Sequence, residues 1–397
     1  MDDDSRARAL RDRRDVPRPA DRRHHLDVTP HPNHARRRWR DRRRLPAAFL
    51  RERRSRRRQK PLPRLQDAHP SWRDLLSSAL AQHIAPGRRQ NAFDAPAAVK
   101  PILLAGPTGT GKSWLAIELA KAIGGEIINY DSVQIYRGFD IGSAKPAADE
   151  RQAVPHHLFD IVDADEEFNA AEYGKVARVL CSKLHTPVIF VGGTFFYLRA
   201  FLSGLPEMPG RDEAIRTRLR AIAKTERGRE RLHRWLSKID PRSGRKIALG
   251  DRHRVERALE VWLIGGRPIS SWERGSEDEL PSIKIALSLD RARLNEVLDR
   301  RVDAMFASGL LEETRGLLAR FPATARPFGT IGYKEAAAVV RGEMALDTAI
   351  AETKRRTRAY AKRQMTWLRS ERNVHWLDAS DRNAMLAAAL RLIEVES

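Results

Sequence analysis

From Pro101 onward, short apolar runs alternate with amphipathic stretches along the chain. The runs PILLAG (101–106), EIINYD (126–131) and TPVIFVGG (186–193) have the length of strands, and the last is rich in the β-branched residues of buried parallel strands. Between them, segments 113–124 and 169–185 show the apolar spacing of amphipathic helices, and Gly124 closes the first. This alternation of strand and helix predicts an α/β fold with a parallel sheet flanked by helices.

A helical stretch rich in arginine interrupts this pattern from about Asp212 to Gly265 and carries no strand signal. It is followed by IKIALSLD (283–290), which predicts a returning strand, and the rest of the chain has a mainly helical pattern. We therefore expect a catalytic core made of residues 96–207 and 270–397, with an all-helical insertion domain at 208–269.

Residues 1–95 have a different composition from the rest, with many charges and prolines and few large apolar side chains. Such a segment buries too little apolar surface to offset its chain entropy, so we expect a disordered, basic N-terminal tail. Three interpretations of it remain open: an arm that binds nucleic acid, a targeting or regulatory tail, and an extension from an upstream translation start. We favour the last, because no folded pattern begins before Lys100.

The formal charge of +22 indicates a polyanionic partner, because Lys and Arg gain affinity by displacing counterions from phosphates. Much of the excess lies in residues 1–100, which hold 27 Lys and Arg against 12 Asp and Glu. No apolar run reaches the roughly 18–20 residues that cross a bilayer, and the single Cys181 excludes an intrachain disulfide. We expect a cytoplasmic protein that does not enter membranes.

A phosphate-binding loop lies between the first predicted strand and the first predicted helix. The segment GPTGTGKS matches G-x-x-x-x-G-K-[ST] in the strand-to-helix context that this P-loop motif requires. Backbone N–H groups of the loop surround phosphate oxygens, Lys112 bridges phosphates, and the Ser113 hydroxyl is the expected ligand of Mg²⁺. The predicted loop consists of Gly106, Pro107, Thr108, Gly109, Thr110, Gly111, Lys112 and Ser113.

The position of nearby acids separates the enzyme classes that use such a loop. An ATPase usually carries an Asp for Mg²⁺ at the end of the strand that corresponds to 188–191, and no acid stands there. The nearest acid is Asp131, at the carboxyl end of the second predicted strand, where ligands bind in this architecture. Asp131 could bind metal, act as a general base, or cap the following turn. For His156 and His157 we expect a structural role rather than a metal site.

With these residues identified, about 300 residues from Ile102 onward resemble the tRNA dimethylallyltransferases, which prenylate the adenosine beside the anticodon. The resemblance rests on GPTGTGKS and on a series of further segments in the same order. These are DSVQIYRGFDIGSAKP (131–146), PHHLFD (155–160), VGGTFFYLRAFLSGL (191–205), DRHRVERALEVW (251–262), IGYKE (331–335) and RAYAKRQMTWLR (358–369). The C-terminal zinc finger of eukaryotic members does not follow, so the resemblance is to the bacterial type.

The resemblance implies that the loop binds the diphosphate of dimethylallyl diphosphate and that the partner is the tRNA anticodon loop. It implies catalytic roles for Asp131, as the base that engages the adenine amine, for Thr194 and for Lys112. The tRNA-contacting positions that it implies are Asp131, Ser132, Val133, Gln134, Thr194, Arg216, His253, Arg254, Val255, Glu256, Arg257, Arg358, Lys362, Arg363 and Gln364. It also implies Mg²⁺ as cofactor, and we expect a monomer.

Alternatives to these roles follow from the residues themselves. The arginines of HRVER and RAYAKRQ have a spacing that also occurs on solvated helix surfaces. Phe195 stands where many relatives have a small residue, so we expect an altered channel wall beside Thr194. For the whole chain, a P-loop kinase or ATPase and an RNA-binding module with a nucleotide switch are the competing functions, and both are disfavoured by the missing acid after VIFVGG.

Overall fold

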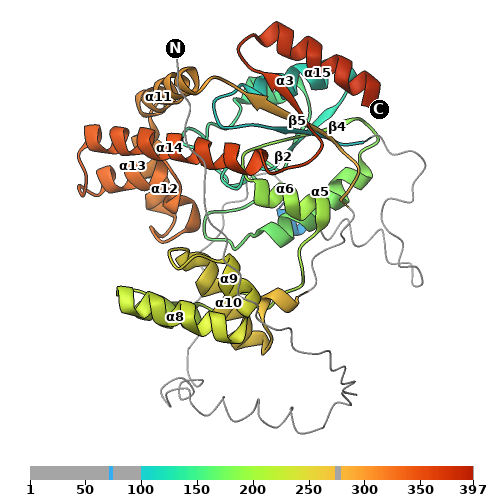
Figure 1. Ribbon diagram of the computed structural model, residues 1–397. Coiled ribbons are helices and arrows are strands. Elements are labelled where there is room, and N and C mark those ends of the chain that lie inside the picture. Colours follow the sequence, from blue (N-terminus) through green and yellow to red (C-terminus); the bar gives the residue numbers. More distant parts are fainter. Residues whose placement is uncertain (1–70, 75–99, 273–278, 397) are drawn as a thin grey trace, which may run out of the picture. The chain divides into compact units, whose positions relative to one another are not determined.

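The computed structural model describes residues 71–74, 100–272 and 279–396. It contains a six-stranded parallel sheet in the order β3-β2-β4-β1-β5-β6 (Figure 1). Because β2, β4 and β1 are neighbours, the loops at their carboxyl ends lie side by side. The strands are β1 (Ile102–Ala105), β2 (Glu126–Asn129), β3 (His156–His157), β4 (Val188–Val191), β5 (Ile283–Ser288) and β6 (Val374–Asp378).

Side chains of the strands alternate between two faces of the sheet, and each face has its own helices. Ile102 and Leu104 of β1 belong to a buried cluster with α3 (Lys112–Ile123) and α15 (Arg382–Glu396). Leu103 of the same strand belongs to a second cluster with α5 and α6. Figure 1 shows α3 and α15 together on one side of the strands and α5 and α6 on the other. The two-residue period of a strand thus supplies both apolar layers.

The remaining helices fall into three groups along the chain. Between β2 and the insertion lie α4 (Ala148–Ala153), α5 (Ala170–Lys183) and α6 (Phe195–Ser203). The insertion holds α7 (Glu213–Ile222), α8 (Glu226–Ile239), α9 (Pro241–Lys246), α10 (Arg252–Gly265) and η3 (Ile269–Ser271). After β5 come α11 (Arg291–Ala307), α12 (Leu310–Arg320), η4 (Arg326–Gly329), α13 (Tyr333–Val340) and α14 (Leu346–Leu368). Within the described ranges, no helix has both the length and the apolar character needed to cross a membrane.

The α/β architecture predicted from the apolar pattern is confirmed, including the strands near 102, 126, 188 and 283 and the helix closed by Gly124. Two strands were missed. β3 consists of two histidines, so it offers no apolar run, and β6 is a half-exposed edge strand within a region predicted to be helical. An edge strand is stabilised by pairing with one neighbour, here β5, and such pairing leaves little trace in the local pattern.

The helical insertion has a hydrophobic cluster of its own. Buried residues of α7, α8 and α10 pack together in it, among them Leu219, Leu236 and Leu259. The edges of Trp235 and Trp262 also meet between α8 and α10, with ring centroids 5.8 Å apart. The insertion is entirely helical, as the sequence predicts, whereas the domain boundaries at 208 and 269 stay a prediction.

The predicted disordered tail at 1–95 lies outside the described residues except for Ser71–Asp74, and there the structure differs from the expectation. The Trp72 side chain is buried and meets the ring of Phe168 edge-on at 5.5 Å, and its backbone N–H donates to the Ile161 carbonyl at 3.3 Å. A composition poor in apolar residues hid this single large anchor. These four residues are part of the folded protein.

We expect Trp72→Ala to lower the free energy of unfolding by about 3 kcal/mol, because it leaves a cavity where a large side chain was buried. Denaturant unfolding of the full chain measures this. Arg73→Ala is the matched control, since its ion pair with Glu166 (3.1 Å) involves a side chain that is 54% exposed, and such pairs contribute about 1 kcal/mol or less. Equal losses in the two variants would contradict the anchoring role of Trp72.

Candidate active site

The predicted phosphate loop runs from β1 into α3. Its backbone bends through left-handed conformations at Gly109 (φ 86°) and Gly111 (φ 81°). A Cβ atom at Gly109 would lie 2.9 Å from Leu298 Cδ2, so the loop fits against α11 only with glycine there. Lys112 opens α3 and donates to the Pro107 carbonyl at 2.8 Å, which curls its side chain back over the loop.

Asp131 follows β2, next to the phosphate loop, and its two oxygens have different surroundings. Oδ1 accepts the backbone N–H of Val133 at 2.8 Å and that of Gln134 at 3.4 Å, so this oxygen caps the turn that follows. Within the described part of the chain, Oδ2 has no hydrogen-bond donor, and Asp131 lines the cavity beside the loop. Capping and a chemical role were alternatives for this residue, and the geometry allows both at once.

Two half-buried basic side chains, Lys112 and Arg301, accompany this carboxylate. Burial, with a smaller effect from the nearby Arg301 guanidinium, lowers the pKa of Lys112 to about 7. Burial also lowers the pKa of Arg301 and raises that of Asp131, although the two backbone N–H groups and both cations act against the latter shift. The site thus brings two basic side chains and one carboxylate together in a partly desolvated cavity, an arrangement that favours an incoming anion.

Helix α14 connects the phosphate loop to the turn after β4. Gln364 accepts the Thr108 N–H at 2.9 Å and donates to the Gly193 carbonyl at 3.0 Å, and the Tyr360 hydroxyl donates to the same carbonyl at 2.7 Å. A Cβ atom at Gly193 would lie 2.9 Å from the Gln364 amide nitrogen and 3.1 Å from Asp131 Oδ2. The double glycine is therefore needed for close packing of this corner around Asp131.

A cavity of about 170 Å³ lies between these elements. Of the predicted site residues it brings together Thr108, Gly109, Gly111, Lys112, Ser113, Asp131, Gln134 and Gln364. The other residues that line the cavity were not among the predicted site residues. They are Trp114, Ser143, Ala144, Pro146, Phe159, Val191, Gly192, Gly193, Arg301 and Tyr360. The phosphate loop, the turn after β2 and helices α11 and α14 thus form one site.

Thr194, a predicted catalytic residue, does not line this cavity. Its hydroxyl accepts the Ser132 N–H at 2.9 Å and donates to the Ser132 hydroxyl at 3.0 Å, so it holds the turn that begins with Asp131. Phe195, for which we expect an altered channel wall, does not line this cavity, and its buried ring stacks on that of Trp367 with centroids 4.3 Å apart. Ser132 and Val133 likewise lie outside the cavity lining.

The arginines that the resemblance assigned to tRNA are largely engaged by acids. Arg216 and Arg257 both pair with the fully buried Glu260, at 2.8 and 2.7 Å. Against the effect of burial, hydrogen bonds from Arg216, the Asp212 N–H and Arg257 lower the pKa of Glu260 to about 2. In the same way Arg254 pairs with Asp251 at 2.5 Å and Arg358 with Asp299 at 2.6 Å.

The other residues assigned to tRNA differ in exposure. Val255 and Glu256 are buried, whereas His253, Lys362 and Arg363 are exposed. The Arg363 guanidinium lies 5.8 Å from the centre of the Tyr360 ring. The segments 253–257 and 358–364 therefore contain both exposed residues and residues that pack or pair within the protein. The sequence left both roles open for them.

Sequence reasoning missed Arg301, although its position carried a signal. In α11 the buried residues Leu294, Leu298 and Val302 mark the face that packs on the core, and Arg301 stands on that face three residues after Leu298. A cation on the apolar stripe of a helix is costly to bury, so it calls for a chemical reason. Tyr360 carried no comparable signal, because a tyrosine in a surface-like helix is unremarkable in sequence.

The residues present suit a magnesium ion that is coordinated mostly by phosphate oxygens and water and by few protein side chains. The Ser113 hydroxyl is exposed at the cavity and makes no hydrogen bond among the described residues, and the Asp131 carboxylate lines the same space. No group of three or more His, Cys, Asp or Glu side chains able to hold a metal occurs in the described part. Mg²⁺ often keeps waters and substrate phosphates in such sites. His156 and His157 instead bond to Val154 and Glu126, at 2.8 and 2.6 Å, as expected for structural histidines.

The fold and the cavity define a P-loop α/β protein whose phosphate loop, at the end of β1, shares a cavity with the Asp131 carboxylate at the end of β2, with β4 between the two strands. The family described as IPP transferase matches residues 134–371, and the chain belongs to this family. It is 45% identical over 284 residues to the tRNA dimethylallyltransferase of Geobacter metallireducens, a match that covers 70% of this chain and 92% of that protein.

Solved structures agree with this assignment. The tRNA isopentenylpyrophosphate transferase of Bacillus halodurans is 35% identical and superimposes with a TM-score of 0.55, covering 75% of this chain and 98% of that one. A eukaryotic dimethylallyltransferase acting on tRNA is 28% identical with a TM-score of 0.59, covering 74% and 77% of the two chains. The predicted family and fold class are confirmed.

The pKa of Lys112 gives a prediction for diphosphate binding. Below pH 7 the unliganded side chain is an ammonium, whereas above pH 7 it must take up a proton to pair with an anion. We therefore expect the affinity for inorganic diphosphate to fall as pH rises above 7, approaching tenfold per pH unit.

Calorimetric titrations at several pH values measure this affinity. Lys112→Arg is the control, because a guanidinium stays charged throughout, and the ratio of the two dissociation constants removes the titration of the ligand itself. Parallel profiles for the two proteins would show that Lys112 keeps its proton, against the prediction.

Proposed function

We propose that the cavity holds dimethylallyl diphosphate and that the protein transfers its dimethylallyl group to tRNA. The acceptor is the exocyclic N6 amine of the adenosine adjacent to the anticodon, and the products are N6-dimethylallyladenosine and diphosphate. The observation that carries this proposal is the half-buried carboxylate of Asp131 in the same cavity as the phosphate loop and the basic side chains of Lys112 and Arg301. Membership of the IPP transferase family supports it.

The phosphate end of the cavity binds the leaving group. The loop amides, Lys112 and Arg301 surround the diphosphate and stabilise the negative charge that grows on it as the bond from carbon to oxygen breaks. Preorganised charges in a site without water act strongly, since they need no reorientation during the reaction. Mg²⁺, held by Ser113 and diphosphate oxygens, would add to this neutralisation when bound.

Asp131 contacts the acceptor amine and serves as its general base. The adenine amine is a weak nucleophile, so its nitrogen must be held in line with the allylic carbon, and such positioning lowers the barrier substantially. Oδ2 of Asp131 accepts a hydrogen bond from the amine and takes its proton as the new bond from nitrogen to carbon forms. Burial raises the pKa of this carboxyl, which makes it a better base than a carboxylate in water.

The proposed acceptor is a base of an RNA, which must reach the cavity from outside the protein. The acceptor base has to leave its stack to reach a cavity among the loops, at a cost of a few kcal/mol that basic contacts offset. Thr194 and Ser132 hold the turn carrying Asp131, so they act as positioning residues at this site. We place the reaction in the cytoplasm and assign it to a monomer.

The decisive assay incubates the purified chain with tRNA from cells lacking this modification, Mg²⁺ and labelled dimethylallyl diphosphate, with ATP hydrolysis measured in parallel. Incorporation of label into RNA is the expected result, and mass spectrometry of the nuclease-digested RNA locates it on adenosine. Release of phosphate from ATP with unlabelled RNA would instead support a P-loop kinase or ATPase. Binding of RNA and nucleotide without either reaction would support a nucleotide-switched RNA-binding module.

Asp131→Asn tests the base. The amide keeps the size of the side chain and can still accept the N–H groups of the turn, but it cannot take the proton. We expect kcat for prenyl transfer to fall by about a hundredfold or more, the usual contribution of a general base. The affinity for tRNA, measured by filter binding, should stay within about threefold of that of the wild type. Near-normal turnover would rule out Asp131 as the base.

A further inference from the structure

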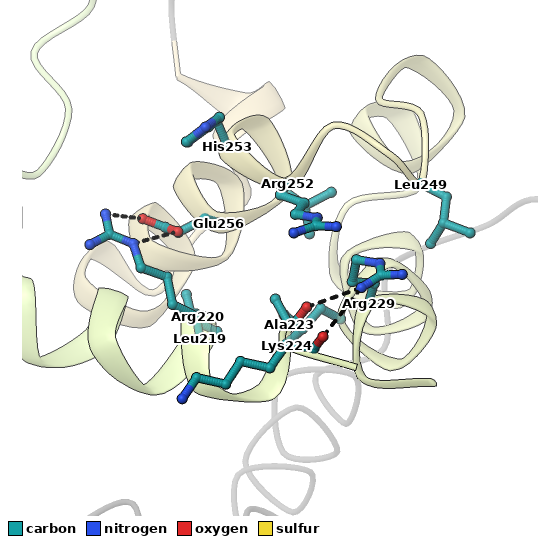
Figure 2. A pocket seen from close by; sticks show the side chains of 11 residues that line it. Leu219, Arg220, Ala223, Lys224, Arg229, Leu249, Arg252, His253 and Glu256 are labelled. Atoms are coloured by element: carbon teal, nitrogen blue, oxygen red, sulfur yellow. Dashed lines mark hydrogen bonds and ion pairs between the residues drawn. The ribbon is translucent and has the colours of Figure 1, made fainter. Parts of the chain in front are cut away.

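A second cavity lies in the helical insertion, and the site described above makes no use of it (Figure 2). It has a volume of about 260 Å³ and lies between α7, α8, α10 and the loop 247–251. Pockets for drug-sized ligands measure roughly 300–1,000 Å³, so this one suits a single ring system. Its lining consists of Leu219, Arg220, Ala223, Lys224, Arg229, Leu232, Leu249, Arg252, His253, Val255 and Glu256.

The floor of this cavity is apolar and one wall is open. Leu219 and Leu232 belong to the core of the insertion, whereas Leu249 is 43% exposed. The loop that carries Leu249 is nevertheless fixed, because the Asp251 N–H donates to the Ala248 carbonyl at 2.9 Å and the His233 ring bonds to the Ile247 carbonyl at 2.7 Å. A fixed loop that presents leucine to solvent provides an apolar wall for a ligand.

The rim of the cavity carries four Lys and Arg side chains and one carboxylate. Arg220 is engaged by that carboxylate, Glu256, at 2.9 Å, and Figure 2 shows the pair on the side of the cavity away from Leu249. Among the described residues, Arg229 donates to the backbone carbonyls of residues 223 and 224 and to no carboxylate. In the described part of the chain, the side chains of Lys224 and Arg252 have neither an ion pair nor a hydrogen bond.

The cavity overlaps the segment that the resemblance assigned to RNA, because His253, Val255 and Glu256 line it. Within 253–257, Arg254 and Arg257 are committed to Asp251 and Glu260, and only His253 is a basic residue of the cavity lining. Of the basic residues in the cavity lining, the side chains of Lys224 and Arg252 have no partner among the described residues, and they flank an apolar recess. A flat apolar group with negative charges beside it is the ligand that complements such a surface.

We propose that this cavity binds an unstacked base of the tRNA, other than the acceptor adenosine, with Lys224 and Arg252 contacting the flanking phosphates. The inference rests on the proposed function, because a single-stranded RNA loop is what offers splayed bases next to phosphates. The base lies against Leu249 and the floor, as apolar side chains receive bases that have left their stack. An acidic protein segment would use the two cations but leave the recess without a purpose.

The test measures binding of an unmodified anticodon stem-loop by fluorescence anisotropy at several salt concentrations. Lys224→Gln and Arg252→Gln should each reduce the slope of log K against log salt by about 0.7, the value for one phosphate contact on a single strand. Leu249→Ala should weaken binding about three- to tenfold and leave that slope unchanged. Lys238→Gln is the matched control, an exposed lysine of α8 outside the cavity lining, and it should change neither quantity.

A second readout places 2-aminopurine at loop positions other than the acceptor. One position should brighten on binding as its base unstacks, and Leu249→Ala should abolish this. The proposal would be overturned if all three cavity variants bound the stem-loop with unchanged affinity. That outcome is also expected if the cavity binds an acidic protein segment instead of RNA. An effect of Lys238→Gln as large as those of the cavity variants would overturn it too. Transfer of label by the wild type is measured on the same RNA. If the protein bound this RNA with the predicted variant effects but transferred no label, the proposed function would be wrong and the base pocket would stand.

Discussion

Three ionisable side chains, Lys112, Asp131 and Arg301, are half-buried around one cavity at the carboxyl edge of the sheet. Burial disfavours the charged form of each side chain, and the attraction between their opposite charges offsets part of this desolvation cost. Because two are cationic and one is acidic, the site is incomplete without an anion, and the surrounding structure keeps them in this state. The order of β2, β4 and β1 in the sheet is what brings the loops together.

The loop at 131–146 shows how much of the chain supports that site. Tyr333 and Glu313 bind the backbone N–H groups of Gly142 and Ile141, at 3.1 and 2.8 Å, so a helix-to-helix corner far along the sequence fixes this loop. Within the loop, the Lys145 ammonium donates to the Tyr136 carbonyl at 2.9 Å and pairs with Asp160 at 2.6 Å. The segment IGYKE, which the resemblance used only as a match, thus has a physical role.

Much of the fold could be predicted because its strands are short apolar runs and its helices have regular spacing. The phosphate loop and Asp131 were found for the same reason, since each stands at a strand end. The roles of Arg216 and Arg257 could not be found, because an arginine paired with a buried acid has the same sequence signature as one facing solvent. Glu260 becomes buried only when α7 and α10 pack, and Trp72 was hidden by the composition around it.

Gln364 is hydrogen-bonded at both ends, to the Thr108 N–H of the phosphate loop and to the Gly193 carbonyl beside Asp131. One amide of the loop is therefore already occupied by the protein. A phosphate oxygen that took the Thr108 N–H would have to displace Gln364, and the freed side chain would loosen the corner around Asp131. One side-chain amide thus joins the phosphate loop to the turn that packs against Asp131, and a ligand that displaced it from Thr108 would alter both.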